Sequence, residues 1–154
     1  MYLWLVLLHL VGVVLFVAMH GVSMAISFWL RRQRDRATIV NLLELSSRST
    51  QVAYLGLLLL GIGGLGAAAT VNLLTTPWVV ASYVVVAVVL VAMFAVAAPY
   101  YYGLRDAISG AKGVTPIDDV ALVERLASRR PEVLAAIGGL GLLAIVWLMV
   151  MKPS

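Results

Sequence analysis

Two histidines, His9 and His20, are the residues with the most chemical potential in this sequence, because both lie inside a long apolar segment. Imidazole is a common axial ligand of haem iron, a ligand of copper or zinc, and a donor of hydrogen bonds between helices. Eleven residues return a helix to within about 20° of its starting direction, so both side chains share one face. They lie about 16 Å apart along the axis. They therefore cannot both bind one iron, whose axial nitrogens are about 4 Å apart.

The face that carries the two histidines is polar, small and aromatic, whereas the opposite face of the segment is apolar. The histidine face also holds Tyr2, Gly12, Phe16, Ser23 and Ser27. The opposite face holds Leu7, Val11, Val14 and Ala18. Polar side chains at membrane depth avoid lipid, so we expect this face to contact protein. His9, His20, Gly12 and Phe16 are the candidate cofactor-binding residues.

Four roles remain open for the histidines: hydrogen bonding between helices, haem ligation, binding of copper or another metal, and catalytic proton transfer. Met24 follows His20 by one helical turn, and a His/Met pair suits Cu(I). His9, His20 and Met24 are thus the candidate metal ligands. In a symmetric homodimer each histidine could meet its own copy across a two-fold axis. Two haem b groups held in this way could pass electrons across the membrane. Alternatively, one haem per chain could use one histidine with a Met, a Tyr or an open site.

Four apolar segments are expected to position these residues. Of the 154 residues, 63% are hydrophobic and 12% are charged, compared with about 25% charged in a soluble domain. About 18 apolar residues suffice to cross a bilayer as a helix. The expected spans are residues 2–30, 52–74, 79–98 and 132–151. They predict an all-α integral membrane four-helix bundle, forming a single membrane domain over residues 1–154.

Charge predicts the orientation of these spans. Ten of the eleven Lys and Arg residues fall in the loops at 31–51 and 99–131. By the positive-inside bias these loops are cytoplasmic and both termini are outside, as in a multi-pass protein of the bacterial inner membrane. The same bias explains the net charge of +4, so we expect a lipid partner and no nucleic acid. The interior of each span lacks Asp, Glu, Lys and Arg, which argues against a pump built on buried carboxylates.

The two charged loops carry local helix signals. Ile39, Leu42, Leu43 and Leu45 predict a short amphipathic helix or an extension of the second span, although a solvated loop is an alternative for the first half. Pro99 and the tyrosines after it mark the inner interface. Thr115 as N-cap and Pro116 at the first helical position predict a helix over 116–129.

Glycine-rich segments suggest an internal repeat. Residues 62–66 and 137–141 share the sequence Ile-Gly-Gly-Leu-Gly, 75 positions apart, as two parallel two-helix repeats would produce. Small residues allow membrane helices to pack closely. We expect Gly61, Gly64 and Ala68 to form one packing face, and Gly138, Gly141 and Ala144 to form another. The chain has no cysteine, which excludes disulfides and thiolate metal sites.

Three short stretches resemble a family of small bacterial predicted integral membrane proteins of unknown function. They are the segments 8–13, 19–23 and 29–32, and Pro99–Tyr101 with Leu104 and Arg105 also fits. More distantly, the Leu-His pair of the first span is similar to copper-resistance D proteins and to J-type protoporphyrinogen oxidases. The oxidases are four-helix, haem-associated and dimeric, and His9 matches their first-span histidine. The chain lacks the intramembrane basic residue of those oxidases, so this resemblance implies haem binding without supplying a reaction.

These observations favour a haem-b-binding membrane protein in electron transfer or haem-linked redox chemistry. A non-catalytic structural or assembly subunit of a larger membrane complex is one alternative, and a copper-handling membrane protein is another. The sequence does not identify an enzyme class.

Overall fold

The computed structural model describes residues 1–110 and 116–153, and the elements in this part of the chain are helices. They are α1 (Tyr2–Leu30), α2 (Arg36–Thr70), α3 (Pro77–Ser109), α4 (Asp119–Leu126) and α5 (Arg130–Met151). Helices α1, α2 and α3 and the segment that ends in α5 are long and apolar enough to cross a membrane. The predicted all-α fold with four membrane-spanning helices is therefore confirmed.

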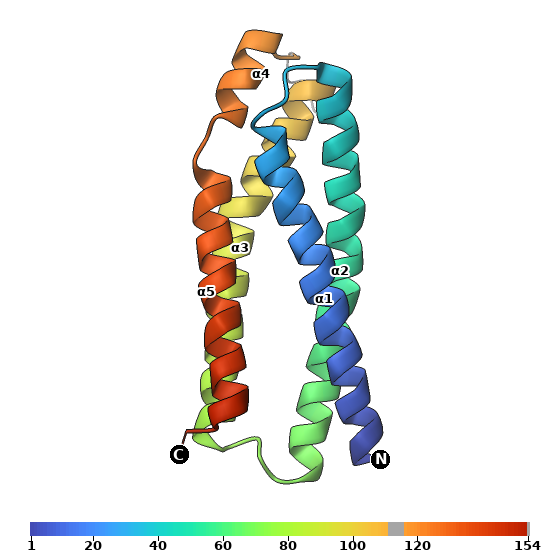
Figure 1. Ribbon diagram of the computed structural model, residues 1–154, viewed down its shortest axis with the longest axis vertical. Coiled ribbons are helices and arrows are strands. Elements are labelled where there is room, and N and C mark those ends of the chain that lie inside the picture. Colours follow the sequence, from blue (N-terminus) through green and yellow to red (C-terminus); the bar gives the residue numbers. More distant parts are fainter. Residues whose placement is uncertain (111–115, 154) are drawn as a thin grey trace.

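The four long helices form two hairpins, α1 with α2 and α3 with α5 (Figure 1). Both termini and the turn between α2 and α3 lie at one end of the bundle, here called the terminal end (Figure 1). The α1–α2 connection and α4 lie at the other end, here called the connection end. The two loops predicted to be cytoplasmic thus begin and end on the same side of the bundle, as their shared charge requires.

Helix lengths show where the membrane can lie. The 22 residues of α5 rise about 33 Å, which matches the hydrocarbon thickness of about 30 Å. The 35 residues of α2 and the 33 of α3 rise about 50 Å each. Both helices must therefore project well beyond the hydrocarbon, and they do so at the connection end, beside α4 (Figure 1).

These lengths decide between the alternatives for the segment before the second span, and they correct the predicted end of the third helix. The amphipathic segment before the second span is a continuous part of α2, so the helical-extension alternative is correct. The third helix does not end near residue 98 but runs through Pro99 to Ser109. A proline removes one helical hydrogen bond, which need not end the helix. Leu104 and Ala107, beyond the proline, are buried against neighbouring helices, and this burial favours the continued helix.

The projecting segments enclose an apolar core at the connection end. It consists of Ile26, Leu30, Ile39, Leu42, Leu43, Leu104, Leu122 and Leu126. These residues come from α1, α2, α3 and α4, so all four helices meet there. Residues 31–51 and the described parts of 99–131 are therefore not simple loops. They form a helical cap with its own core at the connection end of the bundle.

The capping residue of α4 also differs from the prediction. The helix begins at Asp119, and its N-cap is Asp118, whose carboxylate accepts a hydrogen bond from the Ala121 amide at 2.7 Å. Aspartate is among the preferred N-cap residues because it satisfies an amide that has no helical partner. Pro116 precedes this helix, and Thr115 lies outside the described residues. The expected helix over 116–129 is therefore shorter, at Asp119–Leu126.

Polar contacts join the two hairpins at the connection end. Arg31 forms an ion pair with Glu132, linking the end of α1 to the first turn of α5. Arg36 donates to the carbonyl of Ile108 at 3.1 Å, and Arg105 donates to the carbonyl of Leu43 at 2.8 Å. Each arginine reaches from one hairpin to the other, so the cap is where the two halves are held together.

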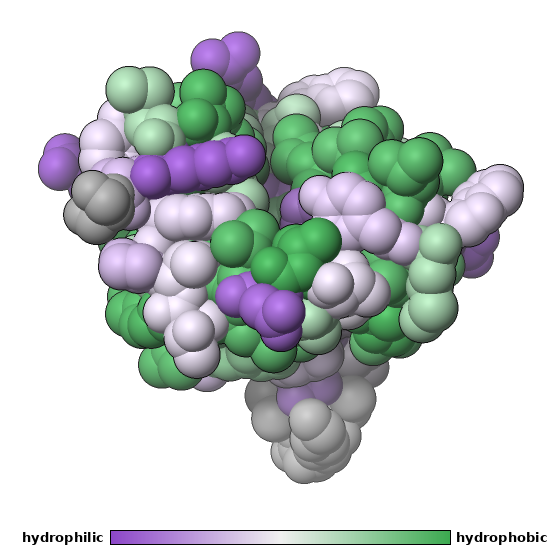
Figure 2. Space-filling model, turned by 90° about the horizontal axis from the view of Figure 1, so that it is seen from below, coloured by the Kyte–Doolittle hydropathy of each residue, from purple (hydrophilic) through white to green (hydrophobic). Residues whose placement is uncertain are grey.

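A cation lies over an aromatic ring at each end of α5. The guanidinium of Arg130 is 5.8 Å from the centre of the Tyr100 ring, and the ammonium of Lys152 is 5.8 Å from the centre of the Trp78 ring. Aromatic and basic residues anchor helices at the two membrane surfaces. Seen from the terminal end, the molecule is mostly apolar or weakly polar, with few strongly hydrophilic residues (Figure 2).

Candidate functional site: the histidine face of α1

Helices α1 and α2 cross in direct backbone contact. A Cβ added to Gly12 would lie 2.8 Å from the carbonyl oxygen of Gly56, and one added to Gly56 would lie 2.6 Å from the amide of Phe16. A Cβ at Gly63 would meet the backbone of His9. Glycine permits this approach because it lacks a side chain, as in other close membrane helix pairs. The histidine face of α1 thus contacts protein, as predicted, and the apolar residues behind it are exposed.

The glycine face of α2 is not the one predicted. Gly56, Gly63 and Ala67 are buried against α1, whereas a Cβ at Gly61 would meet nothing within 4 Å. Gly64 approaches only the ring of His9. The predicted and the observed glycine faces lie about 100° apart around α2. Contact with the α1 backbone decides which of the two faces is buried. The predicted packing role of Gly138 and Gly141 is confirmed, since a Cβ on either would meet α3 side chains.

His9 forms a hydrogen bond between α1 and α2. Its Nδ1 lies 2.7 Å from the carbonyl oxygen of Leu60. A carbonyl only accepts, so Nδ1 is the donor and, in the neutral ring, Nε2 carries the lone pair. The Nδ1–Cε1 edge rests against Gly64, where a Cβ would lie 2.8 Å from Nδ1. The ring is thus fixed in orientation and tautomer by α2.

His20 has different partners and lies where the two hairpins meet. Its ring stacks on Phe16, with centroids 5.5 Å apart and planes at 13°. Its Nε2 lies 3.2 Å from where a Cβ on Gly138 would be, and the methyl of Met93 lies 2.9 Å from the same point. A ring nitrogen from α1 and a methionine methyl from α3 therefore both pack against the same glycine of α5. Met24, one turn along from His20, is 38% exposed.

The histidine face continues toward the connection end as a cluster of hydroxyls. Ser23 Oγ is 2.9 Å from Ser46 Oγ on α2, and Ser27 donates to the carbonyl of Ser23 at 2.8 Å. Tyr101 of α3 donates to Ser27 Oγ at 2.6 Å. The sequence predicts Tyr101 as an interface anchor, with a redox or quinone site as the alternative, and does not predict this contact with Ser27. Tyr101 reaches Ser27 because α3 continues past Pro99.

A family model described as "Predicted integral membrane protein (DUF2269)" matches residues 3–153. The chain belongs to this family. The match covers almost all of the sequence, including both histidines and the whole cap, and it agrees with the family resemblance found from short motifs. No curated protein and no solved structure matches the chain. The more distant resemblance to copper-resistance D proteins and J-type protoporphyrinogen oxidases therefore gains no support.

The arrangement provides two separate imidazole sites. His9 lies within the first hairpin and His20 at the seam between the hairpins, so the two rings have no shared partner. Gly12 lies between them on α1 and contacts the backbone of α2. The ring of Phe16 stacks on the ring of His20. Within the described residues, no three His, Cys, Asp or Glu side chains gather into a metal-binding group. Leu60, Gly63 and Met93 are further members of the site, and their roles depend on helix pairing that spacing does not reveal.

Proposed function

We propose that this membrane protein binds haem b through His9 and serves in electron transfer or haem-linked redox chemistry in the bacterial inner membrane. The hydrogen bond from His9 Nδ1 to the carbonyl of Leu60 carries the proposal. Histidines that ligate metals usually donate their second ring N–H to a carbonyl or carboxylate, which orients the ring and raises its basicity. Nε2 of His9 is the nitrogen left to face an iron.

A second copy of the chain supplies the missing ligand. His20 lies about 16 Å from His9 along α1, which is too far for the two residues of one chain to hold the same iron. In a two-fold dimer, His9 of each copy would ligate the same iron, and the two His20 side chains could hold a second haem. Haem supplies one-electron transfer. The protein residues would orient the ligand nitrogen and exclude water.

An absorption spectrum of detergent-purified protein, oxidised and then reduced, tests the proposal together with the iron-to-protein ratio. Haem ligation predicts a strong Soret band that shifts on reduction, and His9→Ala should remove the haem that His9 holds. It also predicts partial loss in Gly64→Ala, because the added methyl displaces the His9 ring, and no loss in Gly61→Ala, where the methyl meets open space.

Colourless protein that takes up no haem on reconstitution would reject the proposal. The His9 hydrogen bond would then serve helix association alone, and the chain would best suit a non-catalytic subunit that co-purifies with a larger complex. Unchanged haem content in both His9→Ala and His20→Ala would reject ligation by histidine even in a coloured protein.

Copper handling is a second candidate, favoured by the convergence of His20 and Met93 over Gly138. Imidazole and thioether are ligands suited to Cu(I). Metal analysis should then find copper rather than iron, and the copper should be lost in His20→Ala and in Met93→Leu. Loss in Met24→Leu but not in Met93→Leu would place the site along α1 instead.

A further inference from the structure

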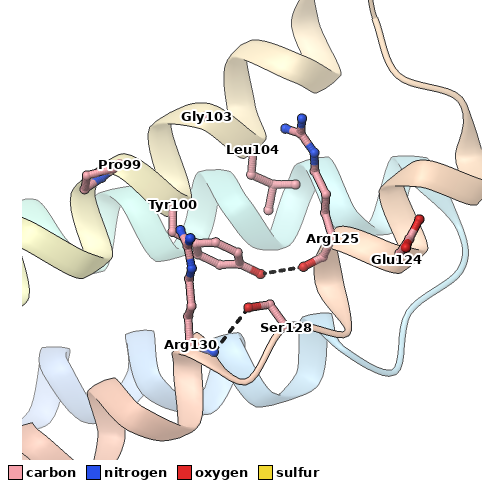
Figure 3. Close-up of a pocket in the computed structure, with 8 residues that line it drawn as sticks. All are labelled: Pro99, Tyr100, Gly103, Leu104, Glu124, Arg125, Ser128 and Arg130. Atoms are coloured by element: carbon pink, nitrogen blue, oxygen red, sulfur yellow. Dashed lines mark hydrogen bonds between the residues drawn. The ribbon is translucent and has the colours of Figure 1, made fainter.

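A half-open cavity of about 330 Å³ lies between α3, α4 and the start of α5, at the connection end (Figure 3). Pro99, Tyr100 and Leu104 of α3 form one side of it. Arg125, Ser128 and Arg130 form the other. Neither histidine lines the cavity, and none of the proposed redox chemistry uses it.

The polar groups of the cavity favour an anion. The side chains of Arg125 and Arg130 extend toward α3 on either side of the Tyr100 ring (Figure 3). The ion pairs of the described residues use other cations, so neither guanidinium is neutralised by a carboxylate. The carboxylate of Glu124 points away from the space between the two arginines (Figure 3). Two unneutralised guanidiniums beside one cavity create a positive site within a partly apolar wall.

Hydrogen bonds hold the cavity in shape. Tyr100 donates its hydroxyl to the carbonyl of Arg125 at 3.2 Å, which fixes the ring that lies beneath Arg130. The amide of Arg130 donates to Ser128 Oγ at 3.3 Å. Ser128 therefore acts as acceptor toward the protein and keeps its hydroxyl hydrogen for another partner. The oxygens of an anionic group in the cavity would receive charge-assisted hydrogen bonds from these guanidiniums.

The position of the cavity identifies the source of that anion. Helix α5 begins at Arg130 and is about as long as the hydrocarbon is thick, so its first residue lies at headgroup level. The second cation–aromatic pair, Lys152 with Trp78, marks the opposite surface. Lipid phosphates are concentrated at this depth, and basic pockets between membrane helices bind anionic headgroups.

We propose that this cavity is a specific binding site for the headgroup phosphate of an anionic phospholipid. Arg125 and Arg130 would hold the phosphate oxygens, Ser128 would donate a further hydrogen bond, and Tyr100 would position Arg130. Binding at this site differs from general attraction of the basic cap to a charged membrane. It would depend on these particular residues and not on the total charge of the cap.

Thermal unfolding of the detergent-purified full chain, titrated with phosphatidylglycerol, phosphatidylcholine or inorganic phosphate, tests this site. Phosphatidylglycerol should raise the unfolding temperature, and phosphatidylcholine should not. The double variant Arg125→Gln/Arg130→Gln should need about 100-fold more phosphatidylglycerol for half its effect, at about tenfold for each charge-assisted hydrogen-bond donor removed. The matched variant Arg34→Gln/Arg48→Gln loses the same number of positive charges from the exposed surface of the cap. The phosphatidylglycerol concentration at half effect, here called the midpoint, should change less than twofold in this variant.

Three results would overturn the proposal. Equal weakening in the two double variants would indicate general electrostatic attraction. An equal response to phosphatidylcholine would show that the headgroup charge is not recognised. A full response to inorganic phosphate would assign the cavity to a free anion rather than a lipid. Ser128→Ala retains every charge and should weaken binding about threefold, so an unchanged midpoint in that variant counts against the site even if the double variant fails to fold.

Discussion

Substitution of Gly12 by alanine should separate α1 from α2. The added Cβ would lie 2.8 Å from the carbonyl oxygen of Gly56 and would also meet the backbone amide of Leu60, whereas ordinary contacts begin near 3.4 Å. The opposing atoms belong to a helix backbone and cannot rotate away. The helices must therefore part by about 1 Å, a strain typical of overpacked interiors.

The cost of this separation can be worked from the contacts. Overpacking costs about 1–3 kcal/mol. His9 lies one turn from Gly12, and its 2.7 Å bond to Leu60 would lengthen beyond hydrogen-bonding range. An interhelical hydrogen bond in a membrane protein contributes about 0.6 kcal/mol. We expect Gly12→Ala to lower the free energy of unfolding by about 1.5–3.5 kcal/mol in total.

Unfolding in mixed micelles of mild detergent and dodecyl sulfate, followed by tryptophan fluorescence, measures this difference. Gly21→Ala is the matched control, since it lies on the same helix and its Cβ would meet nothing within 4 Å. Both variants gain the same helix propensity, and the helices stay largely helical in the unfolded reference state. The control should therefore change stability little. If Gly12→Ala unfolds at the same denaturant fraction as Gly21→Ala, the close α1–α2 crossing described above is wrong.

Two further predictions concern polar contacts. The Thr38 hydroxyl and amide both donate to the Asp35 carboxylate, and these bonds lower the pKa of Asp35 below its ordinary value of 3.8. The stabilisation from these bonds is present above pH 3.8 and is lost as pH falls through the lowered pKa. Amide exchange at Thr38, corrected for its intrinsic rate, should therefore accelerate only below about pH 4. Between about pH 5 and 8 the corrected exchange rate should not depend on pH. Tyr101→Phe removes the donor to Ser27 and should lower the free energy of unfolding by about 0.5–1.5 kcal/mol. Tyr102→Phe, at an exposed neighbouring position, should leave that free energy unchanged, and equal effects of the two would contradict the bond.

The membrane-spanning part of the fold could be predicted because lipid imposes simple rules on it. A backbone in hydrocarbon must satisfy its own hydrogen bonds, so long apolar segments become helices regardless of their β-branched content. The polar stripe of α1 was likewise predictable, because helical geometry alone places His9, Gly12 and Ser23 on one side. That the stripe faces protein follows from the cost of exposing polar groups to lipid.

The cap could not be predicted in the same way, because its structure depends on contacts between distant segments. The apolar spacing of Ile39 and Leu42 indicated an amphipathic helix, but nothing local identified Leu122 and Leu126 as its partners. Pro99 is a typical helix boundary in isolation, and only the burial of later residues favours continuation. The same limit applies to the site, where Met93 reaches His20 through the packing of α3 on α5.

The matched length of α5 makes the two hairpins respond differently to bilayer thickness. Cations over aromatic rings fix both ends of α5 at the two surfaces, so this helix has no spare length, whereas α1, α2 and its own partner α3 are longer than the hydrocarbon is thick. Hydrophobic mismatch would therefore act first on α5, tilting or shifting it, and let the first hairpin remain in place. Such a shear would move Gly138 past His20 while leaving the His9–Leu60 bond untouched. Membrane thickness would thus act on one imidazole and not on the other.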